Sequence, residues 1–141
     1  MILYLDTSSL IKLYVEEHGS AEVEDLLSEA SLVCTSVVAY PEARSAIARL
    51  CREGSLTEEE HLLIKRNLNE DWPYYLVLEA TPGICEAAGD LAEKHALRGF
   101  DSLHLASFLF LAGEDLDGSV RFSSFDDRLN TAASAEPPTR R

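Results

Sequence analysis

Short apolar runs alternate with helical patterns along this chain, and the alternation restricts the fold more than any other feature of the sequence. The runs M-I-L-Y-L, L-V-C-T-S, Y-Y-L-V-L and V-R-F-S cover residues 1–5, 32–36, 74–78 and 120–123. Short apolar runs of this kind are typical of strands that are buried on both faces of a parallel sheet. We therefore expect an α/β fold, a sandwich of helices around a mostly parallel sheet of four or five strands.

The length of the chain fits one domain. Its 141 residues are close to the usual size of a domain, and neither an internal repeat nor an interdomain linker interrupts the pattern. We expect a single domain over residues 1–135. The last six residues, E-P-P-T-R-R, are expected to form a flexible C-terminal tail over residues 136–141.

The apolar segments are too short for export or membrane insertion. The first run ends at Asp6 without the cationic lead of a signal peptide, and the longest later stretch, residues 103–113, falls short of a membrane span. The cysteines Cys34, Cys51 and Cys85 are widely spaced and are expected to be free thiols. From these features we expect a cytoplasmic protein without a membrane partner.

The charge balance excludes general affinity for nucleic acid. The chain has 12 basic and 25 acidic residues, a net charge of −13, and such a surface repels a polyanion. A nucleic-acid role therefore needs local basic residues, bound cations or a basic partner. The candidate basic residues are Lys12, Arg44, Arg49, Arg52, Lys65, Arg66 and Arg98, of which we expect Arg44 and Arg98 to lie nearest the site described next.

Four acidic residues occur where ligands of a parallel α/β sheet bind, beyond the C-terminal ends of the strands. Asp6 ends the first strand, Glu42 lies in the first turn of the helix after the second strand, Asp101 begins the most apolar helix, and Asp126 follows the last strand. Each acid alone is typical of a turn or a helix cap. Together they would repel, by roughly 3 kcal/mol for a pair at ~5 Å and an effective dielectric near 20. A cluster therefore needs a cation, and carboxylates without a His or Cys set favour Mg²⁺ or Mn²⁺ over zinc.

The segments around these acids carry a resemblance to a known family. L-Y-L-D-T-S-S-L-I-K-L-Y, S-x-x-x-x-P-E-A-R-S-A, F-D-S-L-H-L-A and S-F-D-D-R-L-N-T-A-A occur in this order from residue 3 to about residue 133. They resemble the PIN domain, and within it the VapC-type toxins of toxin–antitoxin pairs. The resemblance implies a three-layer α/β/α sandwich and a metal-dependent ribonuclease with an RNA substrate. It also implies a small basic antitoxin as partner, and a homodimer.

The resemblance also assigns roles to the acids. Asp6, Glu42, Asp101 and Asp126 match the four acidic positions of the family, and Ser124 stands where the family often has Thr or Ser. We expect Asp6 and Asp101 to bind Mg²⁺ directly, with Mn²⁺ able to substitute, and Asp126 to complete the metal site. Glu42 would hold a metal-bound water or orient the nucleophile. We interpret His104, on the same helix face as Asp101, as a histidine of the core or one that supports the site rather than a catalytic group.

Three other functions remain open at this stage. A phosphatase of the haloacid dehalogenase type needs a second Asp two residues after the first, and Ser8 stands there. A non-catalytic binding module with the PIN fold would ordinarily lose some of the acids, and this chain keeps all four. An acidic domain without a metal is the third possibility, and a metal titration would separate it from the others.

Overall fold

The computed structural model describes residues 1–114 and 119–137, and its centre is a four-stranded sheet. The strands are β1 (Ile2–Leu5), β2 (Leu32–Ser36), β3 (Leu76–Leu78) and β4 (Val120–Ser123). They lie in the order β3-β2-β1-β4, and all three pairings are parallel. The fold predicted from the sequence is confirmed, and the sheet has four strands.

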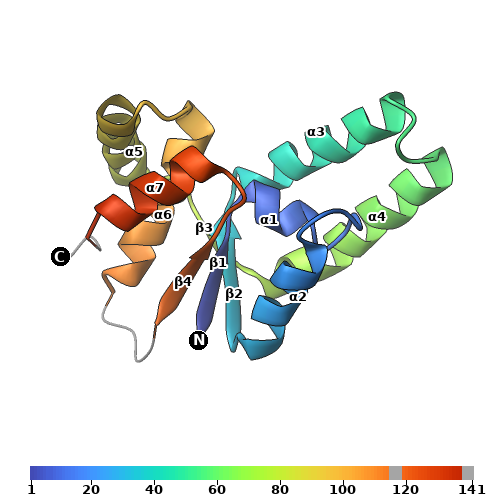
Figure 1. Cartoon of the computed structure of the whole chain (residues 1–141), viewed down its shortest axis with the longest axis horizontal. Coiled ribbons are helices and arrows are strands. Elements are labelled where there is room, and N and C mark those ends of the chain that lie inside the picture. Colours follow the sequence, from blue (N-terminus) through green and yellow to red (C-terminus); the bar gives the residue numbers. More distant parts are fainter. Residues whose placement is uncertain (115–118, 138–141) are drawn as a thin grey trace.

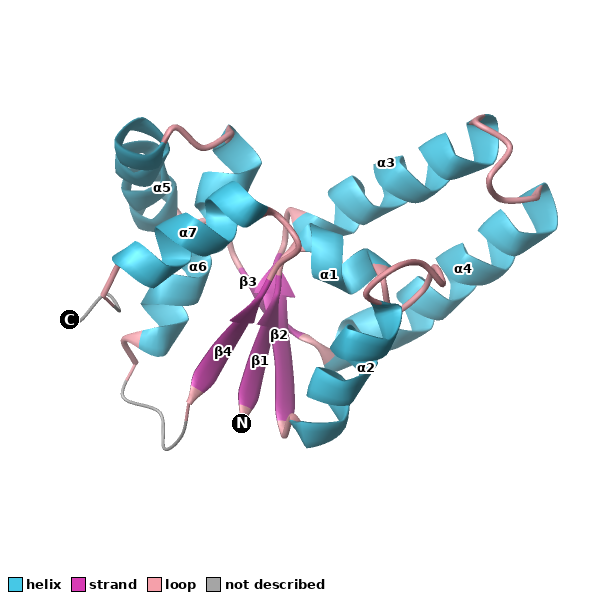
Figure 2. Cartoon of the chain, viewed as in Figure 1, coloured by secondary structure: helices cyan, strands magenta, loops and turns pink. Residues whose placement is uncertain are grey.

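Helices cover both faces of the sheet, as Figures 1 and 2 show. The first group comprises α1 (Thr7–Ile11), α2 (Ser20–Glu29), α3 (Ala39–Arg52) and α4 (Glu58–Asp71), which is followed by a 3₁₀ turn, η1 (Trp72–Tyr74). The second group comprises α5 (Pro82–His95), α6 (Gly99–Ala112) and α7 (Asp127–Ala135) on the opposite face. The two groups meet above the C-terminal ends of β1 and β4, where the functional site described below lies.

The strands are buried because each contributes to a packed core. Leu3, Tyr4 and Leu5 of β1 are fully buried. Leu3 and Leu5 pack against α1, α3 and α4. Helix α6 has eight buried residues and is the central helix of its layer, as its apolar sequence predicts. The buried residues run from Ser102 to Leu111, so the body of the helix is held in the core while its first turn, which carries one of the acids, reaches the surface.

Two helices begin elsewhere than their sequences suggest. Residues 7–9, T-S-S, are of types that commonly cap helices, but Asp6 is the cap of α1, and its side chain accepts a hydrogen bond from the backbone N–H of Ser9. Helix α6 begins at Gly99 rather than at Asp101. Asp101 therefore lies inside the first turn of α6, where a carboxylate is favoured by the helix dipole, instead of preceding the helix.

The leucines of α4 differ in burial. Leu68 is fully buried, whereas Leu62 and Leu63 are 65% and 48% exposed. Trp72, just after α4, packs against the ring of Tyr40. Leu62 and Leu63 thus remain available to a partner.

The segment expected to be a tail begins with an anchored residue. Glu136 accepts from Lys94 Nζ at 2.8 Å and from His95 Nε2 at 2.6 Å. Of the remaining expected tail, Pro137 is described and residues 138–141 lie outside the described residues. Across the part of the chain that the structure describes, no helix is long and apolar enough to cross a membrane.

Candidate functional site

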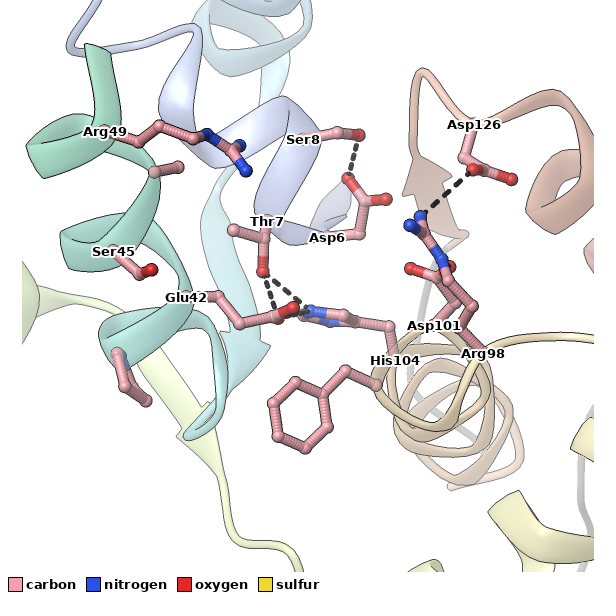
Figure 3. A pocket seen from close by; sticks show the side chains of 13 residues that line it. Asp6, Thr7, Ser8, Glu42, Ser45, Arg49, Arg98, Asp101, His104 and Asp126 are labelled. Carbon is pink, nitrogen blue, oxygen red and sulfur yellow. Dashed lines mark hydrogen bonds and ion pairs between the residues drawn. The ribbon is translucent and has the colours of Figure 1, made fainter. Parts of the chain in front are cut away.

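All four acids line a single pocket of about 540 Å³. Asp6 reaches it from the end of β1, Glu42 from α3, Asp101 from α6 and Asp126 from the turn after β4 (Figure 3). The predicted convergence of acids from distant parts of the chain is therefore present in the structure. The other lining residues are Thr7, Ser8, Pro41, Ser45, Ala46, Arg49, Arg98, Phe100 and His104.

Asp6 is the most buried of the four acids and is held by hydrogen bonds on both oxygens. It is only 3% exposed. Its Oδ1 accepts from Ser8 Oγ at 2.7 Å and from the backbone N–H of Ser9 at 3.0 Å, and its Oδ2 accepts from Ser124 Oγ at 2.6 Å. Burial raises the pKa of Asp6, and the hydrogen bonds from the three serines oppose that rise. Three hydrogen-bond donors thus hold this buried carboxylate in a fixed orientation.

Ser124 connects two of the acids. Its Oγ donates to Asp6 Oδ2, and the same oxygen accepts from the backbone N–H of Asp126 at 3.0 Å. Asp126 in turn caps α7 by accepting from the backbone N–H of Leu129 at 2.8 Å. The Ser124 hydroxyl therefore links the two acids, alongside the pairing of β1 with β4 and the hydrogen bond from Phe125 N–H to Ser8 Oγ.

Glu42 is held by two side chains that were not assigned to it from the sequence. Thr7 Oγ1 donates to Glu42 Oε1 at 2.6 Å, and His104 Nε2 lies 3.1 Å from the same oxygen. Burial alone would raise the pKa of Glu42, but the hydrogen bonds from His104 and Thr7 outweigh it and lower the pKa. Glu42 is therefore held as a carboxylate at the edge of the pocket.

Asp101 and Asp126 share a cation supplied by the protein itself. Arg98 Nε donates to Asp101 Oδ2 at 3.0 Å, and an Arg98 terminal nitrogen lies 3.8 Å from Asp126 Oδ2. The Arg98 side chain is 82% exposed, so solvent screens both contacts. Arg98 therefore offsets part of the repulsion between these two acids.

The donor chemistry of the pocket fits a hard divalent cation, since the available ligands are carboxylate and hydroxyl oxygens. In the arrangement described, however, no three His, Cys, Asp or Glu side chains within residues 1–114 and 119–137 are placed to hold one metal ion. Arg98 engages the two acids that would have to join Asp6. Because Arg98 is exposed, it can leave them without disturbing the core.

The positions of the basic residues differ in part from expectation. Arg98 lines the pocket as predicted, but Arg44 does not. The guanidinium of Arg44 lies over the ring of Tyr40 and donates to its hydroxyl at 2.8 Å. Arg49 reaches the pocket instead (Figure 3). Arg49 is seven residues after Glu42, and this two-turn helical spacing is the signal that places both on one face of α3.

The chain is similar to known proteins over nearly its whole length. A family model described as PIN domain matches residues 3–134. Ribonuclease VapC45 of Mycobacterium tuberculosis is 37% identical over 134 residues, which cover 95% of this chain and 90% of that protein.

Two solved structures share the fold. FitAcB from Neisseria gonorrhoeae superposes with a TM-score of 0.68 at 19% identity, covering 95% of this chain and 94% of that chain. VapBC2 from Rickettsia felis, bound to a DNA fragment from their promoter, superposes with a TM-score of 0.54 at 13% identity, covering 77% and 80%. At these identities the likeness shows the fold alone.

Proposed function

The chain belongs to the PIN-domain family, in its VapC-type branch, and on that premise we propose that it is a metal-dependent ribonuclease, the toxin of a toxin–antitoxin pair. The observation that carries the proposal is the meeting of Asp6, Glu42, Asp101 and Asp126 in one pocket. Strands and helices separated by up to 120 residues of sequence deliver these acids to a common place. Buried or half-buried acids destabilise a fold, so their retention points to a use.

The acids divide into two roles. Asp6, Asp101 and Asp126 would hold Mg²⁺, for which Mn²⁺ can substitute, after Arg98 releases the last two. The bound ion supplies an activated water and neutralises charge that develops on the phosphate. Glu42, held on one oxygen by Thr7 and His104, orients the attacking water.

Two arginines supply positive charge to the phosphate backbone. Arg49 and Arg98 line the same pocket as the acids, from α3 and from the start of α6. A net charge of −13 leaves little attraction for RNA elsewhere. We therefore infer that binding depends on a few local contacts and on the shape of the RNA.

The acidic surface also suits a basic protein partner. We propose a small basic antitoxin that places an Arg or Lys among the acids, as Arg98 does within the chain. Leu62 and Leu63, exposed on α4, are available for a partner or for a homodimer. The three cysteines are free thiols, which agrees with activity in the cytoplasm.

One observation favours a second candidate, a binding module without catalysis. Arg98 already neutralises Asp101 and Asp126, as an internal cation would in a site that takes no metal. The two functions predict opposite results when the purified chain is incubated with total cellular RNA, with Mg²⁺ or with a chelator. Cleavage that needs Mg²⁺ supports the ribonuclease, and mapping of the cut ends separates endonucleolytic from exonucleolytic action. Intact RNA with Mg²⁺ and with Mn²⁺ would contradict it.

A further inference from the structure

A buried chain of polar side chains connects the core of the sheet to Glu42. Tyr4 Oη lies 2.9 Å from His104 Nδ1, and His104 Nε2 lies 2.9 Å from Thr7 Oγ1 and 3.1 Å from Glu42 Oε1. Tyr4 is fully buried and His104 is 1% exposed. The chain brings together β1, the start of α1, α3 and α6, and Figure 3 shows its outer part.

The donors and acceptors along this chain determine where the protons are. Tyr4 is fully buried, so its phenol must donate its proton to a neighbouring acceptor. Two acceptors lie beside it, His104 Nδ1 at 2.9 Å and the hydroxyl of Ser107. The lone pair of His104 Nδ1 is available to Tyr4, because Nε2 faces the carboxylate oxygen of Glu42, which only accepts hydrogen bonds. In a neutral imidazole the proton then lies on Nε2, the nitrogen that faces Thr7 and Glu42.

Two donors consequently converge on one oxygen of Glu42. Nε2–H of His104 and the hydroxyl of Thr7 both point to Oε1, at 3.1 and 2.6 Å. Among the described residues no hydrogen bond is made to Oε2. The carboxylate is thereby fixed in rotation about its last bond, with one oxygen turned to the protein and the other available to the pocket.

We propose that His104 is a positioning residue, held by Tyr4 as the Nε2–H tautomer, and that it fixes Glu42 so that Oε2 faces the water and phosphate of the reaction. This inference rests on the proposed function. His104 acts through Glu42, because its Nε2 faces Glu42 and Thr7 and its side chain, at the wall of the pocket, is only 1% exposed.

If His104 were purely structural, its loss would lower stability but not the turnover of the folded enzyme. Buried polar groups can often be replaced at modest cost if every partner is also satisfied or removed. Here every buried side-chain nitrogen and oxygen of the described residues has a partner, so a substitution is expected to reduce stability whatever the role of His104. The test must therefore separate turnover from stability.

Three substitutions and one control make this separation. His104→Gln keeps an N–H donor near the position of Nε2, His104→Leu removes it, and Tyr4→Phe removes the group that selects the tautomer. Ser20→Ala is the control, because Ser20 is also buried and hydrogen-bonded but its Oγ donates to Val15 O, and Ser20 does not line the pocket. Melting temperature and circular dichroism establish that each variant is folded.

The kinetic readout is the cleavage rate of a short RNA that spans a mapped cut site, at saturating Mg²⁺. Loss of a residue that orients a side chain of a metal site typically lowers activity by 10–100-fold. We expect kcat to fall by roughly 10–100-fold in His104→Leu and less in Tyr4→Phe, with KM changed by less than about twofold. His104→Gln restores most of kcat, and Ser20→Ala leaves it unchanged. A folded His104→Leu variant with the wild-type kcat overturns the inference.

A second readout does not depend on activity. The NMR shifts of the ring nitrogens distinguish a neutral imidazole with its proton on Nε2 from the other tautomer and from imidazolium. We expect the Nε2–H form in the wild type and loss of this preference in Tyr4→Phe. The Nδ1–H form in the wild type overturns the inference. Failure of the wild type to cleave RNA overturns the proposed function instead, and the tautomer then still decides the hydrogen-bond assignment of His104.

Discussion

Arg98 Nε donates to Asp101 Oδ2 at 3.0 Å from one helical turn before it, and this contact places a cation at the entrance of an otherwise acidic pocket. The same guanidinium lies 3.8 Å from Asp126. Two acids that are expected to bind a divalent ion are thus neutralised in part by the chain itself. A metal ion bound at these acids would compete with Arg98 for these oxygens.

Replacing Arg98 should therefore strengthen metal binding. Contacts of such an exposed side chain are worth at most about 1 kcal/mol, so Arg98→Gln is expected to bind Mn²⁺ up to about fivefold more tightly. Calorimetric titration with Mn²⁺ measures the change. Arg52→Gln, which removes the same charge at an exposed position outside the pocket, should bind Mn²⁺ like the wild type. Weaker binding by Arg98→Gln would show that Arg98 supports the metal site rather than competing for it.

Gly19 packs against the turn that carries Asp126, and a side chain there is expected to be costly. Gly19 has φ of 95°, and a Cβ would lie 2.6 Å from Phe125 Cε1. Gly54 has φ of 82° but nothing within 4 Å of its Cβ position. Both Gly→Ala variants incur about 1–2 kcal/mol of left-handed backbone strain. Gly19→Ala should lose roughly 1–3 kcal/mol more, because Phe125 must move.

Urea unfolding of the two glycine variants measures this difference. Since Phe125 precedes Asp126, Gly19→Ala should also weaken Mn²⁺ binding, whereas Gly54→Ala should not. Equal losses of stability in the two variants would contradict the close contact between Gly19 and Phe125.

The ion pairs of Glu136 predict a pH-dependent contribution to stability. Hydrogen bonds from Lys94 and His95 lower the pKa of Glu136. A carboxyl with a lowered pKa in the folded state stabilises the fold above its usual pKa, and this contribution disappears as pH falls through the lowered value. Glu136→Gln is therefore expected to lower the free energy of unfolding at neutral pH by up to about 1 kcal/mol, and by nothing once both states are protonated.

The measurement is the difference in unfolding free energy between the wild type and Glu136→Gln, at neutral pH and at about pH 3. Glu93→Gln is the control, because Glu93 is exposed on α5, beside Lys94 and His95, and no described residue pairs with it. A difference that persists unchanged at acid pH would show that the charge of Glu136 is not what stabilises the C-terminal segment.

The sequence predicted the elements best where strong local signals agree. The bounds of β2 and β4 match the structure, since short apolar runs between turns admit few alternatives. Strong local signals also stand at two helix starts, where Thr57 caps α4 before three acidic residues and Pro82 opens α5. The start of α6 was placed two residues late because Asp101 is a typical cap residue and Gly99 is a poor helix former.

The four acids of the pocket were predictable from the sequence, but the contacts between its residues were not. Strand ends in a parallel sheet meet, and this rule located the acids. The choice of Arg49 over Arg44 depends on the helical face of α3, and proximity in sequence to Glu42 favoured the wrong one. The bonds from Thr7 and His104 to Glu42 span 35 and 62 residues and depend on side-chain rotamers, which a sequence pattern does not specify.

The most direct test of the account is the Mg²⁺-dependent rate of RNA cleavage in acid-to-amide variants of the pocket. Asp6→Asn and Asp101→Asn should remain folded and lose at least about 100-fold in rate, because each would remove a ligand of the proposed catalytic Mg²⁺. Asp127→Asn, an exposed acid beside the pocket residue Asp126, should cleave like the wild type. Wild-type cleavage by folded Asp6→Asn and Asp101→Asn would contradict the claim that these carboxylates hold the catalytic metal.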